Sequence, residues 1–207
     1  MNKPHIRNTP KLLIASSNPG KIVEITNLLD DIPIEIITPD QIALKISVDE
    51  NGSSYTENAC LKALAYARTS NFFSIADDTG LEVKELGGLP GLKSARFSPK
   101  HNATDKDRRE FLLELLKEKP KPWIANFHCA ITVASPSGDT QSGEGECQGE
   151  IISEEHGTFG FGYDPIFLIR YLGKTMAELS LEEKNRISHR AKAVRAIKPY
   201  LREFFRI

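Results

Sequence analysis

The chain has 207 residues, of which 40% are hydrophobic and 27% charged, a composition typical of folded globular proteins. Its 27 lysines and arginines balance 28 aspartates and glutamates, so no overall field exists to attract nucleic acid or an anionic membrane. We therefore expect no nucleic-acid partner and no membrane partner. An anionic ligand would have to be held by a local cluster of residues.

The N-terminus and the cysteines exclude further classes. The segment MNKPHIRNTP contains no apolar core of a secretion signal, and no later apolar run is long enough to cross a bilayer, so a cytoplasmic protein is expected. Cys60, Cys129 and Cys147 are far apart and form no CxxC pair. That spacing argues against a disulfide framework and against a zinc site.

Strands and helices are predicted to alternate along the first part of the chain. The apolar run KLLIA (11–15) predicts a buried strand that SSNPG ends, and apolar residues over 22–29 then recur at helical spacing. IEII (34–37) predicts a second strand.

A helix and a strand are predicted next. The segment from Thr56 to about Ser70 is rich in Ala and Leu and predicts a helix, and FFSIA (72–76) predicts a strand. We expect this strand to carry Asp77 and Asp78 at its C-terminal end.

The second half continues the mixed pattern. Leucines around 111–116 predict a helix closed by KPKP, and alternating side chains over 123–152 around a PSGD turn predict a hairpin. A last helix with one apolar face begins at Ser188. The expected class is mixed α/β, with one core that is split into two lobes around a cleft.

Ligands of α/β sheets gather where strands end and helices begin, and four such junctions are candidate sites. The first is SSNPGK (16–21), where small hydroxyl residues and Gly20 let backbone amides approach a phosphate and Lys21 adds a positive charge. It lacks the GxxxxGK[ST] spacing of a Walker A loop. A capped helical turn explains the stretch without any ligand.

The second junction is the acidic pair Asp77 and Asp78. Two neighbouring carboxylates repel, and a divalent cation between them and a phosphate is one way to keep both ionised. Magnesium suits such a site because it prefers oxygen ligands and keeps several waters. A simple turn is the alternative, because Asp-Asp-Thr-Gly is also good turn chemistry.

The third junction is GTFGFGYDP (157–165). Its glycines permit unusual backbone angles, so that Phe161 and Tyr163 would offer flat faces to a nucleobase. Packing without a ligand is the alternative here.

The fourth junction, EEKNRISHRAKA (182–193), places His189 and Arg190 in the first turn of the last helix, where cations are unfavourable. This placement predicts an acceptor outside the helix, such as a carbonyl or phosphate oxygen.

Together with YTENACLKA (55–63) and ADDTGLEVKELGGLPGLKSARFS (76–98), these stretches resemble the signature blocks of the inosine triphosphate pyrophosphatases, which hydrolyse non-standard purine nucleoside triphosphates. The blocks follow in the family's order from about residue 11 to 193. The resemblance implies an elongated mixed-sheet α/β fold, two lobes flanking a central cleft, and a homodimer. It also implies Mg²⁺-dependent conversion of ITP, dITP or XTP to the monophosphate and pyrophosphate. A single domain would span 11–207 after an N-terminal extension, 1–10.

The resemblance also implies roles for matching residues. Asp78 would bind the metal and accept a proton from the attacking water, and Glu50 would be the second metal-site acid, although Asp49 and Glu57 compete for that role. Asp77 would complete the polar network with Lys62. The implied substrate-binding residues are Ser16, Ser17, Asn18, Pro19, Gly20 and Lys21 for the triphosphate, Lys62 and Thr79 beside it, and Phe161, Gly162, Tyr163, Asp164, Lys184, His189 and Arg190 around the nucleoside.

The implied reaction is attack of water at the α-phosphorus with pyrophosphate as the leaving group. Hydrogen bonds donated to a 6-oxo group, from Arg190 or nearby amides, would disfavour the 6-amino group of adenine. Two other functions remain open. One is a nucleotide sensor without turnover, and the other is a Maf-like pyrophosphatase for other modified nucleotides.

Overall fold

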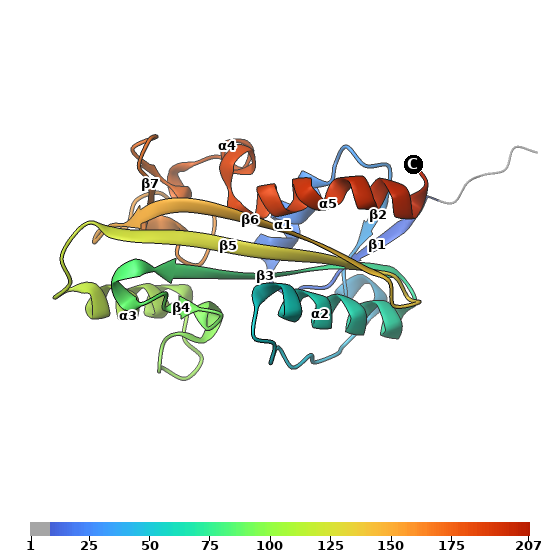
Figure 1. Cartoon of the computed structure of the whole chain (residues 1–207), viewed down its shortest axis with the longest axis horizontal. Coiled ribbons are helices and arrows are strands. Elements are labelled where there is room, and N and C mark those ends of the chain that lie inside the picture. Colours follow the sequence, from blue (N-terminus) through green and yellow to red (C-terminus); the bar gives the residue numbers. More distant parts are fainter. Residues whose placement is uncertain (1–8) are drawn as a thin grey trace, which may run out of the picture.

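The computed structural model describes residues 9–207 and shows an elongated molecule built on one eight-stranded mixed sheet (Figure 1). Most of the expected N-terminal extension, residues 1–8, lies outside the described part. The strands are β1 (Lys11–Ile14), β2 (Glu35–Ile37), β3 (Phe73–Val83), β4 (Pro90–Gly91), β5 (Trp123–Ala134), β6 (Thr140–Ile151), β7 (Phe167–Ile169) and β8 (Lys174–Thr175).

The strand order is β2-β1-β3-β5-β6-β7-β8, and β4 pairs with β3. Strand β1 runs parallel to β2 and β3, and the remaining pairs are antiparallel. The predicted hairpin is therefore correct, with β5 and β6 paired along their whole length. The predicted α/β class is confirmed.

Five α-helices surround this sheet: α1 (Pro19–Leu28), α2 (Tyr55–Ser70), α3 (Asp105–Leu116), α4 (Leu181–Ile187) and α5 (His189–Phe205). Helices α1 and α5 cover one face near β1, and α2 covers the opposite face (Figure 1). Two helix starts follow directly from capping residues, because the side chains of Ser54 and Ser188 accept hydrogen bonds from the first turns of α2 and α5. No helix within residues 9–207 has the length and apolar character that a bilayer crossing requires.

Two large apolar clusters lie at opposite ends of the long strands. One packs α1 and α5 on β1, β3 and β5, with Ile25 and Ile197 among its buried members. The other joins α3 to the far ends of β3, β5 and β6, with Leu112 and Phe127 among its members. The strands β3, β5 and β6 run through the sheet between these clusters, which correspond to the two expected lobes.

Strand β3 differs from the prediction. It continues to Val83 and pairs with β5 from Ser74 to Val83, so Asp77 and Asp78 lie in mid-strand and not at its C-terminal end. On its other edge, β1 pairs with β3 as far as Ile75, and β4 begins its pairing only at Leu81. Within the described residues, the segment between these two partners therefore has an open edge.

Candidate active site

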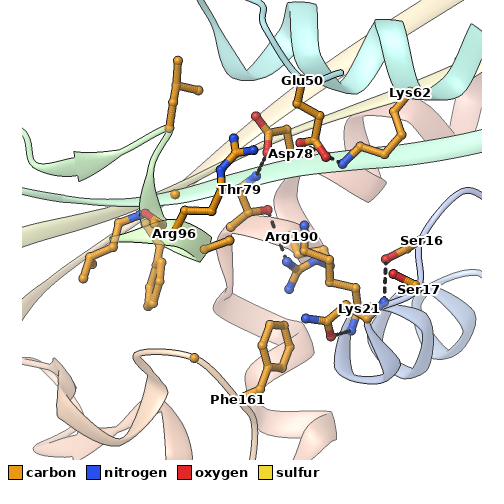
Figure 2. Close-up of a pocket in the computed structure, with 18 of the residues that line it drawn as sticks. Ser16, Ser17, Lys21, Glu50, Lys62, Asp78, Thr79, Arg96, Phe161 and Arg190 are labelled. Atoms are coloured by element: carbon orange, nitrogen blue, oxygen red, sulfur yellow. Dashed lines mark hydrogen bonds and ion pairs between the residues drawn. The ribbon is translucent and has the colours of Figure 1, made fainter. Parts of the chain in front are cut away.

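A cavity of about 470 Å³ lies at this open segment of β3 (Figure 2). It is bordered by the end of β1, the start of α1, the loop before α2, and the glycine-rich loop that follows β6. The expected site residues that line it are Ser16, Ser17, Asn18, Lys21, Glu50, Lys62, Asp78, Thr79, Phe161, Gly162, Tyr163, Asp164, Lys184, His189 and Arg190. Residues from five separate sequence stretches thus meet in one place.

Pro19 and Gly20, the first two residues of α1, do not line the cavity. Asn18 caps that helix through a 3.1 Å hydrogen bond from the backbone N–H of Lys21 to Oδ1. Gly20 is needed for close packing, since a Cβ added there would lie 2.3 Å from Cδ1 of Phe161. The stretch is therefore both a capped turn and one wall of the cavity.

Asp77 and Asp78 do not share a metal ion, contrary to the reasoning from the acidic pair. Successive residues of a strand point to opposite faces. The Asp77 carboxylate faces α1 and α5, where its Oδ2 lies 3.2 Å from Nζ of Lys21 and accepts hydrogen bonds from Arg190. Asp78 instead accepts a 3.0 Å hydrogen bond from Asn58 of α2. The repulsion between the two side chains is thus relieved by separate partners.

The two carboxylates also differ in pKa. Burial alone would raise the pKa of Asp77, but the positive charges of Lys21, Arg190 and Lys62 outweigh burial and hold it well below its ordinary value. For Asp78, burial is the dominant influence and raises the pKa of the carboxyl group. A buried carboxylate of raised pKa that faces a cavity is the usual character of a proton acceptor.

Glu50 also faces the cavity, as do Asp105 and Asp164, and Figure 2 shows Glu50 beside Asp78. Its Oε2 lies 3.2 Å from Nζ of Lys62, which also donates a 3.0 Å hydrogen bond to the carbonyl of Asp77. The competing acids are absent from the cavity lining, and Glu57 is held by Ser53 at the start of α2.

The pair Asp78 and Glu50 fits magnesium by the chemistry of its donors. Within residues 9–207, no group of three or more His, Cys, Asp or Glu side chains could hold a metal ion. Magnesium does not require such a group, because it commonly takes one or two carboxylates together with phosphate oxygens and water.

The cations of the last helix have protein acceptors. Arg190 is 1% exposed, and its Nε and Nη2 donate to Oδ2 of Asp77 at 3.1 and 3.0 Å. Its Nη2 also donates to Thr79, and its Nη1 donates to Glu24 of α1. The predicted external acceptor therefore exists, but it is a pair of carboxylates and not a phosphate. A guanidinium has five N–H groups, so these partners leave one for a ligand.

His189 does not place a second cation at the start of α5. Burial, together with the charges of Arg190 and Lys184, lowers its pKa well below the ordinary value, so the ring is neutral near pH 7. The ring stacks on Phe127 with centroids 4.6 Å apart. Its Nδ1 is buried without a hydrogen-bond partner among the described residues.

A buried chain of charges links β3 to the glycine-rich loop, through Asp77, Arg190, Glu24, Lys184 and Asp164. Lys184 of α4 lies 2.7 Å from Glu24 and 2.5 Å from Asp164. Burial raises the pKa of Glu24, but the charges of Arg190 and Lys184 outweigh that effect and leave it lowered. Glu24 was not singled out from the sequence, because its two partners lie about 160 positions away and no local pattern marks it.

Phe159 of the aromatic loop is 61% exposed but lies outside the cavity lining, so Phe161 is the partly exposed ring that this loop contributes to the cavity. Phe161 is partly exposed, and its ring lies near the charged groups of Lys184 and Arg190. Tyr163 is 5% exposed and donates a 2.9 Å hydrogen bond to the carbonyl of Ser94. Phe161 is therefore the ring available for stacking, and Tyr163 fixes the loop.

Sequence reasoning missed several residues of the cavity wall. Arg96 is exposed, and Figure 2 shows it reaching toward Asp78 and Thr79. Asp105 and Arg108 also border the cavity from the start of α3. The available signal for Arg96 was a cation directly after the GLPGLKSA stretch, next to an acidic strand.

The fold and the cavity define an α/β protein with a cleft that is lined by lysines and arginines, by the facing acids Asp78 and Glu50 among others, and by the partly exposed ring of Phe161. Residues 12–200 match the Ham1 family, and the chain belongs to that family. This membership confirms the resemblance found from the sequence blocks.

Several similar proteins with curated names are dITP/XTP pyrophosphatases. A dITP/XTP pyrophosphatase of Desulfotalea psychrophila is 43% identical over 91% of this chain and 84% of its own length. A dITP/XTP pyrophosphatase of Bacillus subtilis is 39% identical over 91% of this chain and 96% of its own length.

Solved structures agree with this fold. The Ham1 protein of Staphylococcus aureus superposes with a TM-score of 0.81 at 39% identity, covering 94% of this chain and 99% of its own. A HAM1 protein of Coxiella burnetii gives a TM-score of 0.83 at 36% identity, covering 94% of this chain and all of its own.

Proposed function

We propose that this protein hydrolyses dITP, XTP and ITP to the nucleoside monophosphate and pyrophosphate, and so removes non-standard purines from the nucleotide pool. The relatives named dITP/XTP pyrophosphatases support the substrate class. The single observation that carries the chemistry is that the buried Asp78 carboxylate faces the same cavity as the N-terminal end of α1 and Lys21. A proton acceptor and a phosphate-binding element thus share one space.

Asp78 is the proposed proton acceptor. It orients a water molecule whose oxygen bonds to the α-phosphorus, and its carboxylate takes the released proton. The bond from the α-phosphorus to its bridging oxygen breaks as the new bond forms, and the electron pair leaves with pyrophosphate. Lys21 and Arg96 offset the negative charge that gathers on the phosphate oxygens, and the positive end of the α1 dipole adds to their effect.

Mg²⁺ is the proposed cofactor, held by Asp78 and Glu50 together with the substrate phosphates. Such an ion neutralises phosphate charge and lowers the pKa of a neighbouring water. Lys62 lies 3.2 Å from Glu50 and orients this acid from the side of α2.

The nucleoside is proposed to lie against Phe161, within reach of Lys184, His189 and Arg190. The remaining N–H of Arg190 can donate to a 6-oxo group, whereas a 6-amino group would leave that buried donor unpaired. Neutral His189 avoids a third positive charge beside Arg190 and Lys184.

We also propose that the protein is a cytoplasmic homodimer formed from one 11–207 domain, and that it has neither a nucleic-acid nor a membrane partner. The family supports the dimer, and the balanced charge supports the absence of nucleic acid. Light scattering after size exclusion measures the oligomeric state.

The decisive experiment compares turnover of dITP, XTP, ITP, GTP, ATP and dUTP with and without Mg²⁺, and identifies the first product. We expect pyrophosphate, preference for the first three substrates, and dependence on the metal. Orthophosphate as the first product would exclude attack at the α-phosphorus. Preference for dUTP would favour a pyrophosphatase for other nucleotides, and tight binding with no turnover would indicate a sensor.

A further inference from the structure

Two side chains near the start of α3, those of Asp105 and Arg109, form hydrogen bonds with the backbone of Gly162 in the glycine-rich loop after β6. The two residues precede Gly162 by 57 and 53 positions. The backbone N–H of Gly162 donates a 2.8 Å hydrogen bond to Oδ2 of Asp105, and its carbonyl accepts a 2.8 Å hydrogen bond from Nη1 of Arg109. Both polar backbone groups of one residue are thus held by side chains one helical turn apart. This glycine directly follows Phe161, the partly exposed ring that the loop contributes to the cavity.

Arg109 also holds the loop at a second point. Its Nε donates a 2.9 Å hydrogen bond to Oε1 of Glu155, and its Nη2 donates a 2.9 Å hydrogen bond to Oε2 of the same carboxylate. Glu155 follows β6 and precedes Gly162 by seven positions, so one guanidinium joins a point near the start of the loop to a point near its end. Arg109 is only 9% exposed and does not line the cavity, so it does not contact a ligand there.

The glycines of this loop explain why hydrogen bonds from α3 are needed to fix its backbone conformation. Gly157, Gly160 and Gly162 all adopt positive φ, and glycine-rich backbone has many alternative conformations to choose from. The bonds of Asp105 and Arg109 are charge-assisted and therefore strong. Burial raises the pKa of Asp105, but the hydrogen bond from Gly162 and the charge of Arg108 outweigh it and leave the pKa lowered, which keeps the carboxylate charged at neutral pH.

We infer that Arg109, which acts together with Asp105 on Gly162, is a positioning residue for the nucleobase: it holds Phe161 in the place where the base stacks and does not itself touch substrate or the reacting atoms. The inference rests on the proposed function. Pre-organisation of a binding loop lowers the entropy that is lost on binding. A loosened loop should therefore lower the affinity for the nucleobase selectively. The part of the cavity that is proposed to bind the phosphates lies on α1 and β3. Other contacts hold it in place, so its affinity for phosphates should not change.

The test compares Arg109→Met, Arg109→Lys and the control Lys106→Met. Lys106 lies on the same helix, is exposed, and its only ion pair is a 3.7 Å contact with Glu110 in the described residues. The Met variant removes all three hydrogen bonds and keeps the aliphatic stem, whereas Lys keeps the charge without the fork geometry. Affinities for dIMP and for pyrophosphate are measured separately by calorimetry, beside KM and kcat for dITP.

We expect Arg109→Met to bind dIMP about tenfold more weakly and to raise KM for dITP by a similar factor, with kcat and pyrophosphate affinity within about twofold of wild type. Arg109→Lys should be intermediate and Lys106→Met unchanged. Glu155→Gln gives the same direction with a smaller effect and serves as the second variant if Arg109→Met fails to fold.

The outcomes separate the inference from the proposed function. If the wild-type protein hydrolyses dITP, and Arg109→Met or Glu155→Gln binds dIMP as tightly as wild type does, the inference is wrong and the proposed function stands. An equal loss of dIMP and pyrophosphate affinity also overturns it, because a general loss of structure would then explain the effect. Wild-type protein that neither hydrolyses dITP nor binds dIMP overturns both.

Discussion

Arg190 donates two hydrogen bonds to a single carboxylate oxygen of Asp77, although the two residues are 113 positions apart in the chain. Each side chain is 1% exposed. The pair ties α5 to the middle of β3, directly behind the cavity wall that Thr79 provides. The geometry of the site and the stability of the fold therefore depend on the same contact.

Replacing Arg190 by Met should strongly destabilise the protein. The change leaves the carboxylates of Asp77 and Glu24 buried with fewer partners, and removing one member of a buried ion pair costs about 3–5 kcal/mol. Urea unfolding followed by circular dichroism measures the loss. The matched control is Arg195→Met, an exposed arginine of the same helix whose bonds go to backbone carbonyls of α4. Equal losses in the two variants would contradict the prediction.

Asp77 should make stability fall at acid pH. Its pKa is lowered in the folded state, so its contribution is fully present above the ordinary value of 3.8 and is lost as pH falls below it. The free energy of unfolding, measured in urea between about pH 2 and pH 5, should therefore drop more steeply for wild type than for Asp77→Asn. Parallel curves would show that Asp77 does not carry this effect.

Asp78→Asn should separate activity from stability. Loss of the proton acceptor should lower kcat by about 10²–10⁴-fold. The raised pKa of Asp78 means that its ionised form costs stability above that pKa, and the cost disappears as pH falls through it. At pH 7, without metal, the Asn variant should thus melt no lower than wild type. A variant with wild-type turnover would show that Asp78 is not the acceptor.

Glu50→Gln should weaken metal binding, and so raise the Mg²⁺ concentration that activity requires, without unfolding the protein. Glu50 is partly exposed and faces Asp78, so its loss removes one of two anionic oxygen donors. We expect half-maximal activity to need about tenfold more Mg²⁺ or higher, and chelation to abolish turnover in both proteins. Asp49→Asn, at the neighbouring exposed position outside the cavity lining, is the control. An identical shift in the control would place the metal elsewhere.

Much of the fold was predictable from local patterns. The strand at Leu12 and Leu13 is a continuous apolar run, Ser54 and Ser188 cap helices by short-range hydrogen bonds, and the hairpin follows from strict alternation. The site residues were recognisable because they form ordered blocks along the chain.

The features that were not predictable depend on long-range contacts. An Asp-Asp-Thr-Gly run indicates a turn, and it stays in a strand because Asp77 finds Arg190 and Lys21, and because β5 pairs along the whole segment. Glu24 and Arg109 looked like ordinary charged residues of helix surfaces. Their burial arises only once α4, α5 and the loop after β6 are packed against them.

The strands β3 and β5 contribute residues to both apolar clusters, and β6 pairs with β5 along its whole length. No interdomain hinge separates the lobes at this crossing, so the cleft can change shape only by twisting of the strands or by movement of the loops that line it. Unfolding of either cluster would also remove apolar packing from the strands that the two clusters share. Calorimetry should therefore record a single cooperative transition, with equal calorimetric and van't Hoff enthalpies.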